Sequence, residues 1–382
     1  MAIEGKSCVK KFDIQPVSRQ IKTITKGCIW FIIPFLAGCG ITGGPRPRMG
    51  SYPASAFPSA FLDINDLGRH SYGIGIFEHN GLAYTARGGH IDIAHLRIAA
   101  DNTRWLTGRT REHLLKGDKE FYFKLNVEPS RYHVKLGYPD YWNKITETDR
   151  QKIAETLSPY LGQYFTYTMT TWHEVLTWFG FKCLLFLPEK KSAFSWEDIY
   201  SNLLGTHLGA MAIADKEHSY DQAMTILLKK EMEELEIQSR KTARQAAREM
   251  KSKIFDGQKY LDRTRSMDIG LYNGYVTPVL VPGICKNATP KLYPVPTLDE
   301  FRKYGFTMEL EIEPKEFESG KILKVIYPDG KGKSIWPDRQ LPIVMHYIEN
   351  DAIKQGFAII PSQKPQQVVS GASPLFHSMP VN

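Results

Sequence analysis

The chain has 382 residues and a mass of 43.6 kDa, with 42% apolar and 24% charged residues. A chain of this size and composition buries one large core or two modest ones, which excludes a disordered or collagen-like protein. Residues 1–38 hold six basic and two acidic residues, which leaves 43 basic and 39 acidic residues in 39–382. A net charge of +4 over that length does not predict a nucleic-acid partner.

A signal peptide is predicted at residues 1–38. The basic N-terminal region leads into the apolar run Cys28–Gly38, which is about eleven residues long and contains Pro34. A membrane-spanning helix needs about 20 apolar residues, so we expect cleavage and not a permanent span. A buried N-terminal helix is the alternative interpretation.

The end of this run, Leu36-Ala37-Gly38-Cys39, resembles the bacterial lipobox, in which the cysteine is acylated and becomes the new N-terminus. The resemblance implies that Cys39 anchors the protein to a membrane and that the body faces the periplasm. Gly40 in place of Asp resembles the outer-membrane sorting signal of enteric lipoproteins, with the inner membrane or the cell surface as alternatives. Residues 39–66 are rich in Gly, Pro and Ser and are predicted to form a flexible tether.

An oxidising periplasm permits disulfide bonds. After lipidation of Cys39, the body retains Cys183 and Cys285 alone. We expect either a bridge between these two residues or two buried thiols.

The body begins with a predicted hairpin, because Asn80-Gly81 separates two short apolar stretches between Gly68 and Gly89. Alternating residues predict two strands within 120–138, around a turn at 128–130. Helical spacing and capping residues predict helices over 91–115, 146–179 with a break near Pro159, 195–214 and 218–255.

Beyond Asp268, Pro-rich loops alternate with short apolar stretches. These stretches, at 275–281, 307–312 and 322–327, are predicted to be strands. We therefore expect an α+β fold whose helical middle of three or four long helices has small antiparallel β elements at both ends. The expected division is a mainly helical core at 67–270 and a β-containing C-terminal portion at 271–382, packed on the core, with a loose tail from about 362. Within the last long helix, the charges of 229–253 compensate one another, which favours a solvated arm over a nucleic-acid helix.

The densest polar signal is the sequence His90-Ile-Asp92-Ile-Ala-His95 at a helix start. Asp92 and His95 are three residues apart and share a helix face, which is the Asp/Glu-x-x-His spacing of bundle metalloproteins. His90 lies close enough to reach the same place. The alternative is structural, with Asp92 stabilising the helix dipole and His95 bonded within the core.

Two further signals lie near helix ends. His173-Glu174 begins like the zinc-protease sequence His-Glu-x-x-His, but Thr177 replaces the second imidazole, so this is not that motif. Glu197 and Asp198 occupy the first turn of the next helix, where the helix dipole alone explains acidic residues. If all three signals converge, they form one shared site.

The segments 84–97, 171–178 and 196–205, in this order, together resemble a family of uncharacterised bacterial lipoproteins with a domain of unknown function. The resemblance covers most of residues 45–370. It implies an envelope location, and it implies no activity, substrate or fold.

The hypothesis from the sequence is a lipid-anchored envelope protein that acts as a metal-dependent hydrolase on lipid, peptidoglycan or peptide. Zn²⁺ or another divalent transition metal would be held by Asp92, His95 and His173, with His90, Glu197 and Asp198 as further ligands. Glu174 and His173 would then be the catalytic residues.

Two alternatives stay open. One is a non-enzymatic envelope lipoprotein, a scaffold or assembly factor, in which these residues form a buried hydrogen-bond network. The other is metal-free acid–base or transferase chemistry by His173 and Glu174. The expected partners are the membrane and an envelope-derived substrate or protein, and not a nucleic acid.

Overall fold

The structure is a computed structural model that describes residues 44–48, 60–182, 192–254, 264–357 and 359–360. From Gly44 to Asn382 the chain forms one compact unit. The predicted signal peptide, Cys39, Cys183 and the tail from 362 lie outside the described residues. The predictions about them, including the Cys183–Cys285 bridge, therefore stay predictions.

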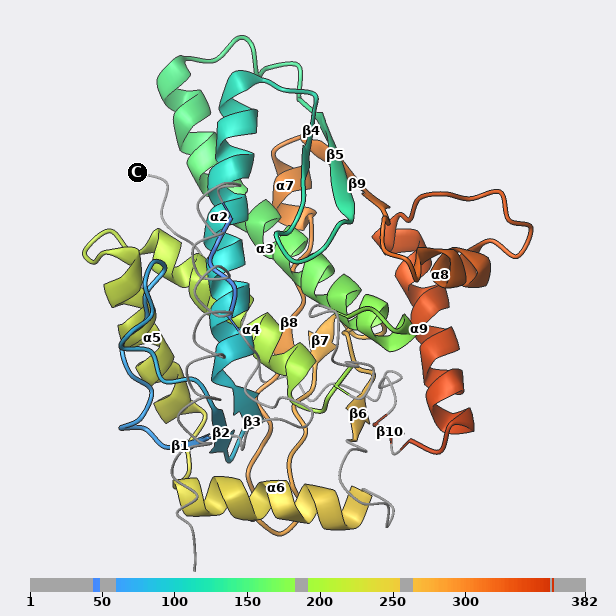
Figure 1. Cartoon of the computed structure of the whole chain (residues 1–382). Helices are drawn as coiled ribbons and strands as arrows, with labels where there is room; N and C mark the ends of the chain where they lie inside the picture. Colours follow the sequence, from blue (N-terminus) through green and yellow to red (C-terminus); the bar gives the residue numbers. More distant parts are fainter. Residues whose placement is uncertain (1–43, 49–59, 183–191, 255–263, 358, 361–382) are drawn as a thin grey trace, which may run out of the picture. The chain divides into compact units, whose positions relative to one another are not determined.

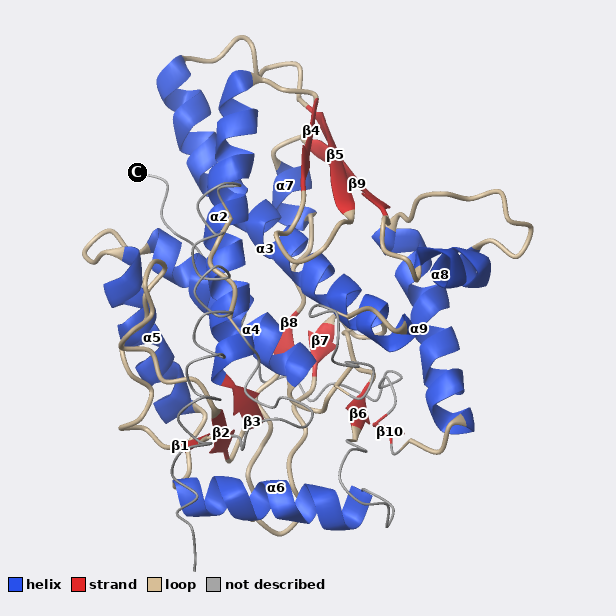
Figure 2. Cartoon of the chain, in the orientation of Figure 1, coloured by secondary structure: helices blue, strands red, loops and turns tan. Residues whose placement is uncertain are grey.

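The predicted α+β class is confirmed, with long helices and several small sheets (Figures 1 and 2). No helix in the described part of the chain is both long and apolar enough to cross a bilayer. In chain order the elements are β1 (Phe61–Leu62), β2 (Leu82–Thr85), β3 (Gly89–Asp92), α2 (Ile93–Lys116), β4 (Glu120–Phe123), β5 (Arg131–Gly137), α3 (Glu147–Phe179), α4 (Asp198–Ala214), α5 (Tyr220–Glu234), α6 (Arg240–Ile254), β6 (Arg265–Ser266), β7 (Tyr275–Val276), β8 (Tyr293–Pro294), α7 (Asp299–Lys303), β9 (Thr307–Glu313), α8 (Ser319–Ile326), α9 (Pro337–Lys354) and β10 (Ile359–Ile360).

Helices α2, α3 and α4 pack against one another at the centre of the fold. Glycines allow their backbones to approach closely. A Cβ atom on Gly205 of α4 would lie 2.0 Å from the carbonyl oxygen of Leu96 in α2, and one on Gly209 would lie 2.7 Å from that of Ala100. Further along α2, a Cβ atom on Gly162 of α3 would lie 2.2 Å from the hydroxyl of Thr107. Any larger residue at these positions would push the helices apart.

Local capping residues set the ends of these helices. Thr146 caps α3 and Gly180 ends it in the left-handed conformation, as the sequence predicted. Asp92, expected within the first turn, is instead the N-cap of α2. The predicted break near Pro159 is wrong, because α3 continues through this residue. Proline leaves the carbonyl of Glu155 without its helical partner, but Glu155 is exposed, so water can bind that carbonyl.

The first sheet differs from the predicted hairpin around Asn80-Gly81. The hairpin lies one segment later, where β2 pairs with β3 across the Gly-Gly break. Gly89 requires a positive φ of 65°, and a Cβ atom there would lie 2.1 Å from the carbonyl oxygen of Val279. The sheets are also not all antiparallel, because β1 pairs with β2, and β10 with β6, in parallel.

The second sheet joins segments that lie far apart in the sequence. β4 and β5 form the predicted antiparallel pair, and β9 adds to β5 with Val134 opposite Leu310. Buried and exposed residues alternate along β4 and β5, so one face of the sheet covers the core. The segment 307–313 therefore belongs to the same sheet as the two strands within residues 120–137.

Two predicted elements of the second half are wrong. The predicted helix 218–255 is two helices, α5 and α6, separated where Glu236 adopts a positive φ of 61°. The stretch 322–327, predicted as a strand, lies mostly in α8, and α9 was not predicted. A short apolar run fits either a strand or a buried helix, so periodicity alone could not decide.

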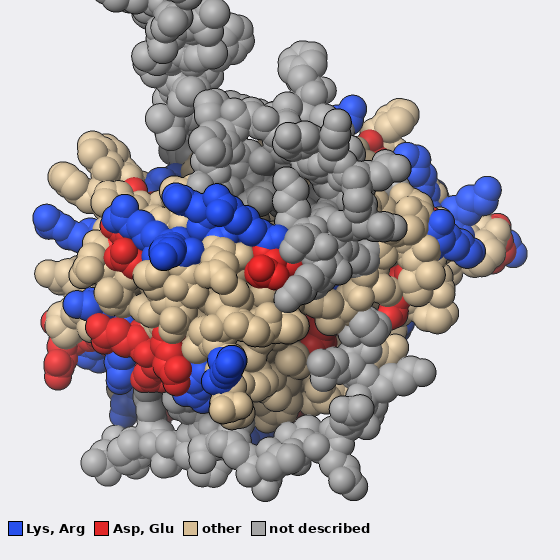
Figure 3. Space-filling view, turned by 90° about the horizontal axis from the view of Figure 1, so that it is seen from below, with Lys and Arg blue, Asp and Glu red and all other residues tan. Residues whose placement is uncertain are grey.

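Helix α6 is solvated along one side only. Ala243 and Ala246 are fully buried in a cluster with Tyr84 and Trp196. On the face seen from below, Lys and Arg side chains lie beside Asp and Glu side chains (Figure 3). Arg240, for example, pairs with Asp66. Helix α6 is therefore amphipathic and packs on the core through its alanine face.

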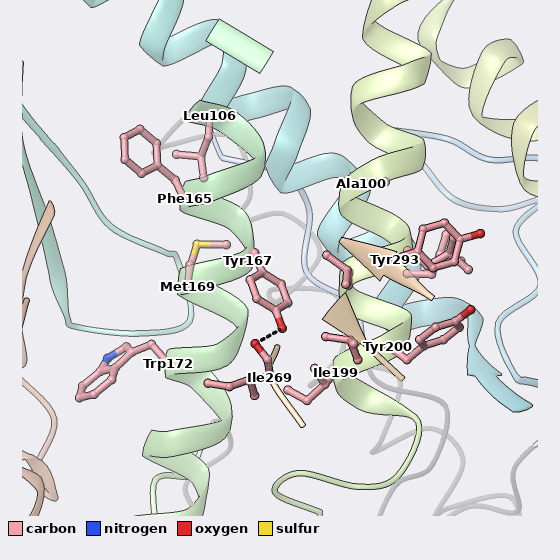
Figure 4. Close-up of a cluster of buried hydrophobic side chains, with 14 of the residues drawn as sticks. Ala100, Leu106, Phe165, Tyr167, Met169, Trp172, Ile199, Tyr200, Ile269 and Tyr293 are labelled. Atoms are coloured by element: carbon pink, nitrogen blue, oxygen red, sulfur yellow. Dashed lines mark hydrogen bonds between the residues drawn. The ribbon is translucent and has the colours of Figure 1, made fainter. Parts of the chain in front are cut away.

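The core beside α3 is aromatic (Figure 4). Phe165 packs against Phe121 and Phe123 of β4, which places the second sheet over this helix. Tyr167 points toward Ile269, and its hydroxyl donates a hydrogen bond to the carbonyl oxygen of Ile269 at 3.1 Å. The segment after β6 is thereby attached to α3.

Residues 44–48, which we call the N-terminal strap, differ from the predicted flexible tether. Arg48 is buried and donates to both carboxylate oxygens of Glu78 at 2.9 and 3.0 Å and to Asp101 of α2 at 2.6 Å. Arg46 also pairs with Glu78. Although burial would raise it, hydrogen bonding to Arg48 and the charge of Arg48 lower the pKa of Glu78 to about 2. The strap is therefore held by buried, paired charges.

The close approach of α2 and α4 generates the first prediction. Gly205→Ala places a methyl group against the backbone of Leu96, and we expect it to lower the free energy of unfolding by about 3 kcal/mol. Gly108→Ala is the control, because Gly108 is an exposed position of α2 with no atom within 4 Å of the new Cβ. It should raise the stability by about 1 kcal/mol. Urea unfolding followed by circular dichroism measures both, and equal stabilities would contradict the proposed contact.

Candidate functional site

Asp92 and His95 meet at the start of α2, as their spacing predicts. Asp92 caps the helix, since its Oδ1 accepts hydrogen bonds from the backbone amides of Ala94 at 2.7 Å and His95 at 3.2 Å. Its Oδ2 lies 3.0 Å from Nδ1 of His95. The capping role and the histidine contact therefore use different oxygens of one carboxylate.

A second carboxylate reaches the same imidazole from α4. Oδ1 of Asp198 lies 3.2 Å from Nδ1 of His95, and Oδ2 accepts the backbone amide of Ser195 at 3.0 Å. The side chain of His95 is 25% exposed, whereas those of Asp92 and Asp198 are 1% and 4% exposed. The ring therefore has two buried carboxylates on one side and reaches solvent with the remainder.

This environment controls the charge of His95. Burial alone would lower its pKa, but the negative charges of Asp92 and Asp198 raise the pKa well above its ordinary value. The two carboxylates therefore favour the protonated form of His95.

Glu174, near the end of α3, is the third acidic member of this group. Burial and the charge of Asp198 raise its pKa to about 7, and the charges of His173 and His95 act in the opposite direction. The ends of α2, α3 and α4 thus lie within electrostatic reach of one another. We call Asp92, His95, Glu174 and Asp198 the carboxylate–histidine cluster.

Two carboxylates of the cluster bind consecutive backbone amides of one turn. The amide of Phe194 donates to Oε2 of Glu174 at 2.7 Å, and the next amide, of Ser195, donates to Asp198. Phe194 has a positive φ of 54°, which is strained for a bulky residue and turns successive N–H groups toward anions. This turn could not be predicted from the residue types, because Phe-Ser is not a typical left-handed pair.

His173 has its own buried carboxylate, which the sequence analysis missed. Nδ1 of His173 lies 2.5 Å from Oε1 of Glu128, in the loop between β4 and β5. The Glu128 side chain is fully buried, while that of His173 is 29% exposed. The site therefore contains a second imidazole that is paired with a buried carboxylate. A Glu in a β-turn was a weak signal, because its partner lies 45 residues away.

His90 lies in a different environment from the cluster. Its Nδ1 accepts a hydrogen bond from the indole of Trp196 at 3.2 Å, and its Nε2 lies 3.3 Å from the carbonyl oxygen of Ala243. Burial lowers the pKa of His90 to about 4. Both ring nitrogens thus contact core groups near α4 and α6, so His90 is a buried residue of β3.

Glu197 also differs from its neighbour Asp198. Its Oε2 accepts the hydroxyl of Ser195 at 2.7 Å, and its backbone carbonyl accepts the hydroxyl of Ser201. It is buried, and no pair with His95 places it in the cluster. The structure thus joins Asp92, His95 and Asp198 directly and Glu174 and His173 through their charges.

In the described residues, no three His, Cys, Asp or Glu side chains are arranged to hold a metal ion. The geometry of His95 gives a physical reason. Its Nδ1 faces two carboxylates that favour the protonated ring, whereas a metal binds neutral imidazole. The residues as placed do not fit the expected zinc site.

A cavity of about 580 Å³ lies elsewhere in the molecule. It is lined by Ala86, Arg87, Glu236, Gln238 and residues 284–289. None of these belongs to the cluster or to the His173–Glu128 pair. The cavity contains no arrangement of acid and base that matches the one around His95.

A family model described as a protein of unknown function (DUF4056) matches residues 59–265 of the chain. This range includes the cluster, the Phe194 turn and the His173–Glu128 pair. No curated protein and no solved structure matches the chain.

The raised pKa of Glu174 makes a prediction about stability. Its folded-state pKa of about 7 exceeds its ordinary value of 4.5, so the folded chain retains a proton that the unfolded chain releases. The stability contributed by this group is present below pH 4.5 and is lost as the pH rises through 7. Glu174→Gln keeps an acceptor for the Phe194 amide and cannot ionise.

We therefore expect Glu174→Gln to match the parent chain near pH 5 and to be more stable at pH 8, by roughly 1–3 kcal/mol. Thermal unfolding across this pH range measures the difference. Glu155→Gln, at an exposed helix position, is the control for the added amide. A constant difference between Glu174→Gln and the parent at all pH values would contradict the buried, partly protonated carboxyl.

Proposed function

We propose that this chain, which belongs to the DUF4056 family of proteins of unknown function, is a lipid-anchored hydrolase of the cell envelope that works by acid–base catalysis. One observation carries the proposal. A partly exposed imidazole has two buried carboxylates, from the starts of two helices, at its Nδ1, and a third carboxyl whose pKa is about 7 lies within electrostatic reach. Groups with such different proton affinities, side by side, are typical of acid–base sites.

The two central residues have complementary roles. Glu174, which is partly ionised at neutral pH, takes a proton from a water molecule, and the resulting hydroxide attacks the substrate bond. The imidazolium of His95 gives its proton to the leaving group. Glu174 then releases its proton to solvent and His95 regains one, which restores the starting state.

The other residues position and tune this pair. Asp92 and Asp198 orient the ring of His95 and keep it protonated. His173, held by Glu128, lowers the pKa of Glu174 and thereby increases the fraction that can act as a base. The amide of Phe194 holds one oxygen of Glu174.

The strain at Phe194 and the burial of three acids favour an enzyme over a scaffold. Both features cost stability, and such costs concentrate at functional sites. A scaffold or assembly factor needs neither a carboxyl with a pKa near 7 nor a partly exposed imidazolium.

The anchor is proposed from the lipobox-like sequence that ends at Cys39. The compact unit begins at Gly44, only five residues later. A lipidated Cys39 would therefore hold the folded body close to a membrane, and the outer membrane is the proposed location. The proposed substrate is a lipid, a peptidoglycan fragment or a peptide of the envelope.

The activity is tested by incubating the detergent-extracted full protein with envelope lipids and with peptidoglycan, and by detecting the hydrolysis products by mass spectrometry. We expect His95→Gln and Glu174→Gln to lower the rate by a factor of about 10² to 10⁴. His218→Gln is the control, because His218 pairs with Asp215 at an exposed helix start and should retain full activity.

Metal analysis and a chelator belong to the same experiment. The proposal expects chelation to leave the rate unchanged. A stoichiometric transition metal together with loss of activity on its removal would favour the metal-dependent hydrolase expected from the sequence. Unchanged activity of both variants, or no product from either substrate, would contradict the acid–base site.

Lipidation is tested separately by intact mass spectrometry of protein extracted from membranes. We expect the polypeptide to lack residues 1–38 and to carry more than one acyl group at Cys39. The added mass should exceed that of a single acyl group, because stable anchoring needs more than one. Cys39→Ala should retain residues 1–38 and carry no acyl group. An unmodified N-terminus in the parent chain would contradict the anchor without affecting the catalytic proposal.

A further inference from the structure

The loop between the strap-binding residues Ser71 and Glu78 exposes three large apolar side chains within four positions. Ile74, Ile76 and Phe77 are 80%, 76% and 64% exposed. Among the large apolar side chains that the structure describes, Phe317 alone exceeds them, and it stands by itself at 96%. A contiguous exposed apolar group of this kind marks a contact surface, whereas single exposed residues are ordinary.

The base of this loop is fixed by hydrogen bonds. The amide of Arg69 donates to the carbonyl oxygen of Phe77 at 2.9 Å, and the amide of Tyr72 donates to Asp221 at 2.8 Å. The amide of Ser71 donates to Glu78 at 2.9 Å. The apolar tip is therefore presented on a rigid support, so that binding requires little further ordering of the chain.

The loop contacts the N-terminal strap. A Cβ atom on Gly75 would lie 2.1 Å from Nη2 of Arg46, and both Arg46 and Arg48 approach the carbonyl oxygen of Ser71. Arg46 lies seven positions after Cys39 in the sequence, and a segment of this length spans at most about 25 Å. An acyl anchor on Cys39 would therefore keep this loop within that distance of the bilayer.

Basic residues flank the apolar tip. Arg69 is exposed, and its guanidinium lies 5.4 Å from the centre of the Phe77 ring. Arg46 also lies against Gly75, but it is only 17% exposed at the side chain and pairs with Glu78. Arg69 is therefore the basic residue available beside the tip, and an apolar tip with an exposed arginine suits the boundary between acyl chains and anionic headgroups.

We propose that residues 74–77 are a membrane-contact loop, which inserts its apolar tip into the headgroup region of an anionic bilayer beside the lipid anchor. The proposal rests on the proposed anchor for the position of the bilayer, and on the exposed residues for the contact. A lipid surface fits better than a protein partner, because the anchor brings this tip to the bilayer and the exposed Arg69 beside it matches anionic lipid. The loop gives the anchored body a defined orientation.

A site-specific tryptophan tests the proposal. Phe77→Trp and Phe317→Trp are prepared in the full protein as extracted from membranes, and each is added to vesicles of phosphatidylethanolamine and phosphatidylglycerol with brominated acyl chains. Bromine quenches a tryptophan that enters the bilayer. We expect the added emission at position 77 to be mostly lost and that at position 317 to be retained. Both positions are exposed, so neither substitution should disturb the fold.

A second variant checks the cause. Ile74→Asp with Ile76→Asp, in the Phe77→Trp chain, should restore the emission, because a charged tip does not enter hydrocarbon. Equal emission at 77 and 317, or quenching at 77 that survives the two aspartates, would overturn the loop proposal. The mass of the same sample reports lipidation independently, so failure of the anchor is distinguished from failure of the loop.

Discussion

The contact between the backbones of α2 and α4 is the constraint on which the candidate site depends. Asp198 lies seven residues before Gly205 and therefore on the same face of α4. Gly205 rests against the carbonyl of Leu96, the residue next to His95. The short side chain of Asp198 can reach the imidazole only at this helix separation. A glycine with no chemistry of its own thus determines whether the histidine has one carboxylate or two.

The sequence predicted the local part of this arrangement and missed the long-range part. The Asp92–His95 contact follows from helical spacing, and the Thr146 cap and Gly180 stop of α3 were predictable from local residue types. Glu128 was not, because its contact with His173 requires the β4–β5 loop to fold back onto α3. The interpretation of 322–327 as a strand failed because its apolar residues also fit a helix. Local periodicity and capping are encoded by neighbours, whereas pairing between distant segments depends on packing.

Two buried glutamates, Glu78 and Glu174, have pKa values that are shifted in opposite directions. The direction of the shift distinguishes a structural carboxylate from one that can exchange protons. Glu78 is paired bidentately with Arg48, and its pKa is lowered to about 2, so it stays ionised and holds the strap. Glu174 has an amide and more distant histidines as neighbours, and its pKa is raised to about 7. A carboxylate with a full guanidinium partner stabilises a fold, whereas one with an incomplete partner can exchange protons at neutral pH.

Helix α2 connects the proposed catalytic group to the proposed membrane contact. His95 lies in its first turn, and Asp101, which binds Arg48 of the strap, follows about 9 Å along the axis. The strap in turn contacts the loop that carries Ile74 and Ile76. A bilayer held by the anchor and the loop would therefore lie at a fixed position relative to His95, with no hinge in the described residues between them. Such a geometry favours a substrate that is itself part of the membrane surface over one that diffuses freely, because only a surface-bound substrate benefits from a catalytic group with a fixed position above it.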